Sequence, residues 1–396
     1  MVAVVLVVGA CGSPPAATSS PPSSAASAAS ASPARTSSAP TASATPVAAL
    51  PLLGSLPTGH FDATTAKALQ AILDDTVHSG APDVIAAVVT KDGTWAGAAG
   101  VDGPKGRKAS AVDEFAVASV TKTFTAALVM RLIEQGKMDL DEPLASYMGD
   151  LKVDTNGATV RQALEMRAGL PDFAQPAAAN HIRVDAAHVW TAEEMVAEFD
   201  APSSPAGETY LYSSPTYELL ARAAEHLTST SYASALRKEL LDPWHADRIV
   251  GQGPEHPTPK PWALPIDGHL GAWAPADLGV GGSIINISSA TYAPGAGSVA
   301  SDAPSLAAWV WHLFAGDILT GESIRLMATH GAGFAYGLES APYGARSVGA
   351  SGGKTGYGAQ FTYFPESGAV IVIFINDPDF IVEPTVSSLL AAATSP

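Results

Sequence analysis

Residues 118–122 read Ala-Ser-Val-Thr-Lys and open a segment, residues 119–135, in which apolar residues recur at helical spacing up to Gly136. Residues i and i+3 share one face of a helix, so this segment places the Lys122 amine beside the Ser119 hydroxyl. A buried amine near a second cation loses its proton close to neutral pH and then acts as a base. The helix N-terminus also favours developing negative charge. The stretch therefore predicts a nucleophilic serine, Ser119, with Lys122 as its partner.

A second serine, Ser351, competes with Ser119, because it forms S-x-x-K with Lys354 and also lies in a G-x-S-x-G motif. That motif is typical of the nucleophile elbow, which needs a helix directly after the serine and a histidine later in the chain. Here a glycine-rich extended segment follows Ser351, and the last histidine is His330. Ser119 is therefore the stronger candidate.

Two further segments favour Ser119. Tyr212 precedes a predicted helix at residues 214–227, with Ser214 as its predicted N-cap. Residues 354–356 read Lys-Thr-Gly, follow three small residues and precede a predicted strand hairpin. Taken singly, these fit a half-buried aromatic, a helix cap and a solvated strand end. Together with S-x-x-K, and in this order, they predict one composite site.

The order of the predicted elements indicates the fold class. A helix and a strand hairpin come first, a helical block fills about residues 140–292, and strands with a final helix follow. This order predicts an α/β unit split by a helical insertion, with a cleft between two lobes. The predicted helices cover residues 64–77, 119–135, 160–167, 192–199, 214–227, 231–241, 305–314 and 384–393, and the hairpins join 83–90 to 94–100 and 360–364 to 369–376.

The N-terminus predicts a secreted, lipid-anchored protein. Residues 2–10 are apolar but, at about 10 residues, too short to span a bilayer. Residues 8–11 read Val-Gly-Ala-Cys, which resembles a bacterial lipobox, so we expect residues 1–11 to be a lipoprotein signal ending at a lipidated Cys11. The alternative is an ordinary hydrophobic start with a chance cysteine. The expected location is extracytoplasmic, on the bacterial cell membrane.

Residues 12–54 predict a disordered tether. Up to residue 50 they are almost entirely Ser, Ala, Pro and Thr, and Arg35 is the only charge there. Such a segment buries too little apolar surface to offset the entropy lost on ordering. A glycosylated stalk has the same composition. The remaining residues, 55–396, are assigned to one folded domain.

Composition excludes several classes of partner. The formal net charge of −17 argues against nucleic acid and gives no electrostatic attraction to anionic lipid. With a single cysteine, no disulfide forms within the chain. The histidines show no metal-site spacing, and no glycine-rich phosphate loop follows a predicted strand, so we expect neither a metal nor another cofactor.

Further segments extend the pattern beyond the three motifs. Residues 159–172, residues 205–212 and residues 297–307 are similar to segments of the penicillin-recognising serine hydrolases, which include serine β-lactamases, D-alanyl-D-alanine carboxypeptidases and related esterases. The resemblance covers most of residues 60–390 and is closest to class C β-lactamases and low-molecular-weight carboxypeptidases. It implies an antiparallel sheet flanked by helices, with an inserted all-helical lobe.

By this resemblance, Ser119 matches the acylated serine, Lys122 its partner, and Tyr212 the tyrosine that acts as or relays to the general base. Lys354, Thr355 and Gly356 match the strand motif beside the site, whose cation orients a substrate carboxylate. The backbone N–H groups of Ser119 and Tyr357 would form the oxyanion hole.

Two departures from the family pattern conflict. Ser214 replaces the usual asparagine, which weakens the case for β-lactam or peptide turnover. The lysine at 354 instead favours a substrate with a carboxylate. We expect a monomeric acyl-hydrolase that acts on D-Ala-D-Ala-like peptides, β-lactams or small esters at the cell envelope. The alternative is a catalytically silent fold that serves as a binding or scaffold lipoprotein.

Overall fold

A computed structural model describes residues 50–173, 185–270, 274–328, 333–340, 343 and 347–395. The predicted lipoprotein signal with Cys11, most of the predicted tether and His330 lie outside these residues. Within the described part of the chain, no helix is both long and apolar enough to cross a membrane.

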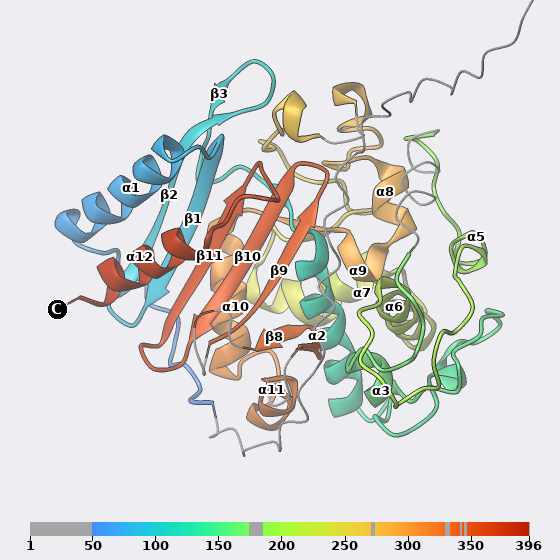
Figure 1. The fold of residues 1–396 in the computed structure, drawn as a ribbon. Helices are drawn as coiled ribbons and strands as arrows, with labels where there is room; N and C mark the ends of the chain where they lie inside the picture. Colours follow the sequence, from blue (N-terminus) through green and yellow to red (C-terminus); the bar gives the residue numbers. More distant parts are fainter. Residues whose placement is uncertain are drawn as a thin grey trace, which may run out of the picture. The chain divides into compact units, whose positions relative to one another are not determined.

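An antiparallel sheet organises the fold (Figure 1). Its described strands are β1 (Asp83–Thr90), β2 (Gly93–Asp102), β3 (Arg107–Lys108), β7 (Phe334–Ala335), β8 (Leu338–Ser340), β9 (Val348–Lys354), β10 (Tyr357–Phe364) and β11 (Ala369–Ile375). They lie in the order β3-β2-β1-β11-β10-β9-β8-β7, so the first hairpin of the chain joins the last one at the centre. The two hairpins that the sequence predicts are present as β1–β2 and β10–β11.

Helices cover both faces of this sheet. The described α-helices are α1 (Ala63–His78), α2 (Thr121–Glu134), α3 (Val160–Leu164), α5 (Ala192–Ala197), α6 (Ser214–Thr228), α7 (Tyr232–Leu236), α8 (Ile287–Tyr292), α9 (Pro294–Gly297), α10 (Ala303–Ala315), α11 (Gly321–Ala328) and α12 (Glu383–Thr394). Shorter 3-10 or π turns are η1 (Ala118–Val120), η2 (Leu144–Tyr147), η3 (Arg237–Leu241), η4 (Asp242–Trp244), η5 (Asp267–His269) and η6 (Pro275–Asp277). A small second sheet has the order β4 (Phe115–Ala116), β6 (Val299–Ser301), β5 (Val250–Gly251).

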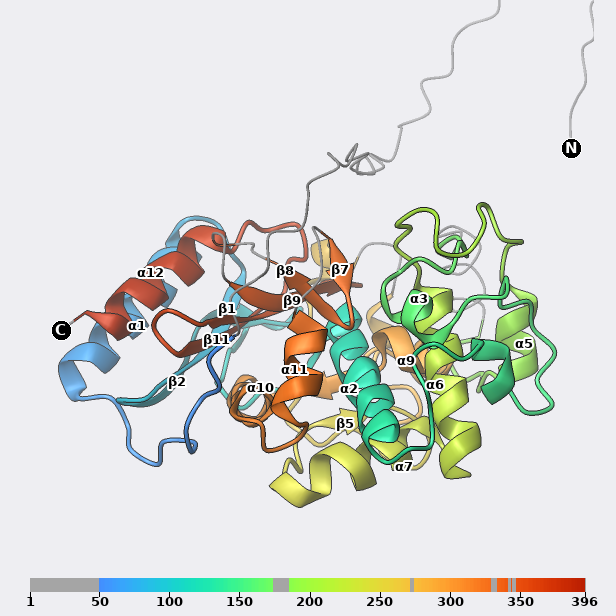
Figure 2. The ribbon, with the colours of Figure 1, turned by 90° about the horizontal axis from the view of Figure 1, so that it is seen from below.

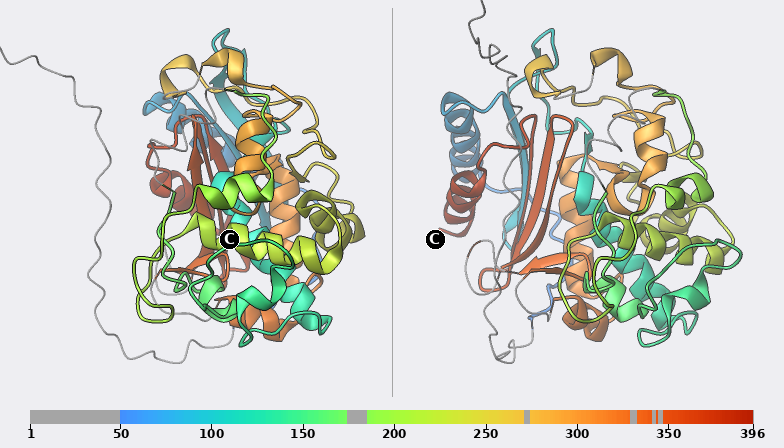
Figure 3. Two further views of the ribbon diagram at one scale, coloured as in Figure 1. Left: turned by 90° about the vertical axis from the view of Figure 1, so that its right-hand side faces the viewer. Right: turned by 45° about the vertical axis from the view of Figure 1, so that its right-hand side comes forward.

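Successive side chains of a strand point to opposite faces of the sheet, so the sheet separates two hydrophobic layers. The even-numbered residues from Val84 to Val88 pack with α1 and α12, whereas the odd-numbered residues from Ile85 to Val89 belong to the larger core that contains α2 and α10. Figure 3 shows α1 and α12 on one side of the sheet and the other helices on its opposite side. This arrangement confirms the predicted α/β class with an antiparallel sheet flanked by helices.

The central helix α2 lies between the sheet and the helical segments α6 and α9 (Figure 2). Most of its residues, including Lys122 and Phe124, are fully buried. The predicted helix began at Ser119, but residues 118–120 form the 3-10 turn η1 and α2 starts at Thr121. Ser119, the candidate nucleophile, therefore lies in a tight turn directly before the N-terminus of a helix that is mostly buried in the core.

Candidate active site

Hydrogen bonds made by the residues before and after Ser119 fix its position against the small sheet. Val117 donates its N–H to Val299 in the small sheet, and the Thr121 hydroxyl accepts the Val299 N–H at 2.9 Å. Ala118, directly before Ser119, has φ 46°, a left-handed conformation that is unfavourable for a residue with a side chain. Such strain concentrates at functional sites, where the surrounding structure enforces it.

Lys122 lies beside the Ser119 hydroxyl, as helical spacing predicts. Its Nζ donates to Ser119 Oγ at 3.0 Å and to the carbonyl oxygen of Ala296 at 3.2 Å. The side chain is fully buried, and this burial lowers the pKa of Lys122 to about 8, although Asp172 and Glu218 act in the opposite direction. The neutral form of Lys122 is therefore far more accessible near neutral pH than that of an ordinary lysine.

Tyr212 approaches Ser119 from the helical lobe, just before α6. Its hydroxyl donates to Ser119 Oγ at 2.9 Å, and its ring lies 4.8 Å from Lys122 Nζ. Burial raises the pKa of Tyr212 well above its usual value, so its phenol is protonated at rest. The structure thus brings together Ser119, Lys122 and Tyr212, while the pKa directions favour the lysine as the resting base.

The structure corrects two details of the motif around Tyr212. Ser213, not Ser214, is the N-cap of α6, and its hydroxyl accepts the N–H of Thr216 at 3.1 Å. Ser214 is the first residue of the helix, and its N–H donates to Asp172 at 2.8 Å. Ser214 is not among the described residues that line the pocket at Ser119.

The Lys-Thr-Gly segment occupies a hairpin turn. Thr355 and Gly356 have φ 49° and 78°, and they connect Lys354 at the end of β9 to Tyr357 at the start of β10. Gly356 packs so closely on the 265–269 loop that a Cβ there would lie 2.7 Å from the carbonyl oxygen of His269. None of residues 354–357 is among the described residues lining the pocket.

Lys354 nevertheless lies close to Lys122, on the inner face of β9. Its Nζ lies 3.8 Å from the position that a Cβ on Gly297 would occupy, next to the carbonyl oxygen that Lys122 contacts. Burial, with a smaller contribution from the positive charge of Lys122, lowers the pKa of Lys354 to about 8, although Glu218 acts in the opposite direction. Lys354 is thus placed to act on Lys122 through charge rather than to contact a ligand in the pocket.

Gly352 and Gly353 take the place beside Ser119 that the sequence assigned to Tyr357. A Cβ on Gly352 would lie 2.6 Å from Ser119 N, so only a glycine allows β9 to approach this closely. Tyr357 lies five residues further along the hairpin, is fully buried, and donates its hydroxyl to Ala263 at 2.8 Å. Tyr357 pairs with Lys354 across the turn, so it lies on β10 and about 7 Å beyond Gly352 along the strand direction.

Strand geometry then identifies the second oxyanion donor. Lys354 and Tyr357 flank a two-residue turn, and their pairing directs the Lys354 N–H toward β10. N–H groups alternate, so those of Ser351 and Gly353 point to the opposite, outer edge of β9. The Ser351 N–H donates there to Glu339 at 3.3 Å. The Gly353 N–H, rather than that of Tyr357, therefore accompanies the Ser119 N–H.

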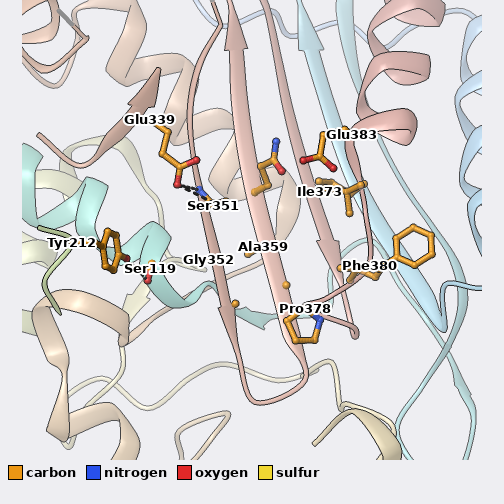
Figure 4. Close-up of a pocket in the computed structure, with 15 residues that line it drawn as sticks. Ser119, Tyr212, Glu339, Ser351, Gly352, Ala359, Ile373, Pro378, Phe380 and Glu383 are labelled. Carbon is orange, nitrogen blue, oxygen red and sulfur yellow. Dashed lines mark hydrogen bonds between the residues drawn. The ribbon is translucent and has the colours of Figure 1, made fainter. Parts of the chain in front are cut away.

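Glu339 is a site residue that sequence analysis missed. It lies on β8 and lines the pocket with Ser119 and Tyr212 (Figure 4). Its Oε1 accepts the Ser351 hydroxyl at 2.9 Å, and burial raises the pKa of its carboxyl. A single glutamate in a short strand has no local signature, so only the pairing of β8 with β9 reveals it.

The pocket extends from Ser119 across the outer face of β9, β10 and β11 (Figure 4). It has a volume of about 440 Å³. At the end away from Ser119, Ile373, Phe380 and Val382 contribute apolar side chains and Glu383 contributes a carboxylate (Figure 4). No group of His, Cys, Asp or Glu that could hold a metal ion occurs among the residues that the structure describes.

In this arrangement a buried amine and a phenol contact one serine oxygen, beside the N–H groups of Ser119 and Gly353. It suits acyl transfer. The sequence profile of the Beta-lactamase family matches residues 67–393. The chain belongs to this family. It is therefore a serine hydrolase of the β-lactamase fold, as the sequence resemblance predicts.

Solved structures support the same fold for the beta-lactamase family domain. The D-amino acid amidase from Ochrobactrum anthropi SV3, complexed with D-phenylalanine, superposes with a TM-score of 0.69 at 23% identity, over 84% of this chain and 100% of the amidase. A penicillin binding protein from Bacillus halodurans gives a TM-score of 0.65 at 17% identity, over 82% of this chain and 98% of that protein. At these identities, the likeness concerns the fold.

By sequence, the chain is also similar to Protein flp from Staphylococcus aureus. It is 26% identical over 146 residues, which are 35% of this chain and 28% of flp. The chain thus spans less than a third of the relative that it matches.

Proposed function

We propose that this protein is a serine acyl-hydrolase that forms an acyl-enzyme on Ser119. The observation that carries the proposal is the convergence of the Lys122 ammonium or amine and the Tyr212 hydroxyl on one serine oxygen, at 3.0 and 2.9 Å. This geometry matches an activated nucleophile with both a base and a proton donor in contact.

In the proposed acylation step, neutral Lys122 takes the proton of Ser119 while Oγ bonds to the substrate carbonyl carbon. The N–H groups of Ser119 and Gly353 hold the oxyanion that develops. Tyr212 then donates its proton to the leaving oxygen or nitrogen as the bond to carbon breaks, and the proton held by Lys122 restores the phenol. In deacylation, water replaces the leaving group and the same transfers run in reverse, which regenerates the Ser119 hydroxyl.

The candidate substrates remain D-Ala-D-Ala-like peptides, β-lactams and small esters. The neighbour from Ochrobactrum is named a D-amino acid amidase, which adds small amides to this set. A requirement for a substrate carboxylate, which rested on Lys354, has no support from the pocket, because Lys354 is not among its described lining residues. Ser214 likewise lies outside the lining, so the missing asparagine has no described substitute there.

We further propose that the enzyme works outside the cytoplasm as a monomer, anchored to the membrane through Cys11. The support is the lipobox-like sequence at residues 8–11 and the Ser/Ala/Pro/Thr-rich segment that follows it. A flexible tether of about 40 residues would hold the catalytic domain roughly 35 Å from the membrane surface.

Covalent labelling tests the proposal. The purified protein is treated with a fluorophosphonate probe and with a labelled penicillin, and the modified peptide is identified by mass spectrometry. We expect an adduct on Ser119 with at least one probe, and none in the Ser119→Ala variant. Absence of any adduct, together with no hydrolysis of p-nitrophenyl acetate, would instead support the catalytically silent scaffold protein.

A further inference from the structure

We propose that Glu339 binds a cationic amine of the substrate, so that the enzyme prefers esters or amides that carry a free ammonium group near the scissile carbonyl. This inference rests on the proposed function of Ser119 and names the substrate class for that site.

The first observation is the charge of the pocket. Its described lining contains two carboxylates, Glu339 and Glu383, and no Lys, Arg or His. Two cations of the described part of the chain, Lys122 and Lys354, lie on the inner side of the sheet edge, where their amines lie near Ala296 and Gly297. A substrate anion in the pocket would therefore meet carboxylates, whereas a substrate cation would be attracted.

The second observation is the way in which Glu339 is held. Its Oε1 accepts both the hydroxyl and the N–H of Ser351, at 2.9 and 3.3 Å, which fixes the carboxylate on the pocket wall. No residue in the described part of the chain donates a hydrogen bond to Oε2. One oxygen is thus occupied in orienting the group, and the other remains for a donor in the pocket. An ammonium group supplies such a donor, together with the complementary charge.

The third observation is the position of Glu339 relative to the reacting groups. It lines the same pocket as Ser119 and Tyr212 (Figure 4), and its charge affects the pKa of both Lys122 and Tyr212. An amine bound to it therefore lies close to a carbonyl that Ser119 attacks, as in an aminoacyl ester or amide.

Glu383 is less suited to this role. It lies at the exposed start of α12, whereas Glu339 is largely shielded from solvent between β8 and β9. Charge interactions weaken in water and strengthen where protein excludes it. The apolar side chains of Phe380 and Val382 would then receive an apolar side chain of the substrate.

A matched set of three substrates tests the inference. Phenylalanine p-nitrophenyl ester, as each enantiomer, is compared with its N-acetyl and N-succinyl forms, which replace the ammonium by a neutral group or a carboxylate. We expect kcat/KM to favour the free amine by about tenfold or more, the effect of one charge-assisted hydrogen bond. Glu339→Gln should remove this preference and Glu339→Asp should retain part of it. Glu383→Gln is the matched control and should keep the ratio.

The readout is the ratio of kcat/KM for the free amine to kcat/KM for the N-acetyl or N-succinyl form. General damage to the enzyme lowers all of these values and leaves the ratio unchanged. The preference should also decline toward acid pH as Glu339 takes up a proton, while hydrolysis of p-nitrophenyl acetate shows no such added loss. An equal or faster rate with the N-acetyl or N-succinyl form, or an unchanged preference in Glu339→Gln, would overturn the inference. If p-nitrophenyl acetate is hydrolysed through Ser119 in that case, the proposed function stands; if no substrate is hydrolysed through Ser119, both are overturned.

Discussion

Gly352 and the backbone amide of Ser119 lie in direct contact, with only 2.6 Å between Ser119 N and the position of a Cβ on Gly352. The same Cβ would lie 2.5 Å from the carbonyl oxygen of Val117. These atoms are all backbone, so they cannot rotate away as a side chain would. The glycine therefore determines how closely β9 and the nucleophile turn approach each other.

Gly352→Ala should separate β9 from Ser119 and misalign the two oxyanion donors. Loss of one such donor lowers kcat by about 10²–10³-fold, and we expect a decrease of this size. The measurement is kcat for p-nitrophenyl acetate, with the thermal midpoint measured in parallel. Gly297→Ala is the matched control, because its Cβ would meet only Lys354 Nζ at an ordinary 3.8 Å. Equal kcat values for the two variants would contradict the assigned oxyanion hole.

Replacement of Ser119 and Ser351 distinguishes the two S-x-x-K motifs. Ser119→Ala removes the proposed nucleophile, so hydrolysis of p-nitrophenyl acetate or nitrocefin should fall by at least about 10⁴-fold. Ser351→Ala loses only the hydrogen bond to Glu339 and should keep a good part of the hydrolysis of the neutral ester. Hydrolysis that persists without Ser119 but disappears without Ser351 would restore the nucleophile-elbow hypothesis.

Tyr212→Phe should lower kcat by about 10²–10⁴-fold, the usual contribution of a positioned proton donor. The ring keeps its contact with Phe334, at 5.7 Å between centroids, so the thermal midpoint should change little. Tyr210→Phe is the control, since the Tyr210 hydroxyl contacts the Phe334 N–H at 3.3 Å rather than Ser119. A similar loss of kcat in both variants would indicate a packing effect and not proton transfer.

The rate should rise with pH up to a plateau above the pKa of Lys122, which burial lowers to about 8. A base works in its neutral form, and the neutral fraction of such an amine increases about 50-fold between pH 6 and pH 8. The measurement is kcat/KM for p-nitrophenyl acetate, corrected for spontaneous hydrolysis. Lys354→Met removes a neighbouring positive charge that favours neutral Lys122, so the midpoint should move to higher pH. A rate that falls from pH 6 to pH 8 would exclude Lys122 as the base.

Cys11→Ala should release the protein from the membrane fraction of the bacterial cells that produce it. A lipidated cysteine supplies the hydrophobic anchor, and the described domain contains no helix suited to span the membrane. Immunoblots of membrane and soluble fractions measure the distribution, with Ser13→Ala as a matched control. If the Cys11 variant stays in the membrane fraction, lipidation of that residue is not the anchor.

The sequence by itself placed Lys122 beside Ser119, because helical spacing is a local property that needs no knowledge of the rest of the chain. It also predicted the two hairpins β1–β2 and β10–β11, since their strands are separated by short turns. Through the three motifs and the longer resemblance, it indicated the family and fold.

Only the tertiary structure decided which residues of the late strand face the nucleophile. The pairing of β9 with β10 turns Lys354 beneath the sheet, moves Tyr357 away, and directs the Gly353 N–H outward. The pairing of β8 with β9 likewise brings Glu339 to the pocket. Edges and faces of a strand alternate with every residue, so a motif alone does not fix them: they depend on the register set by partners that are distant in the chain.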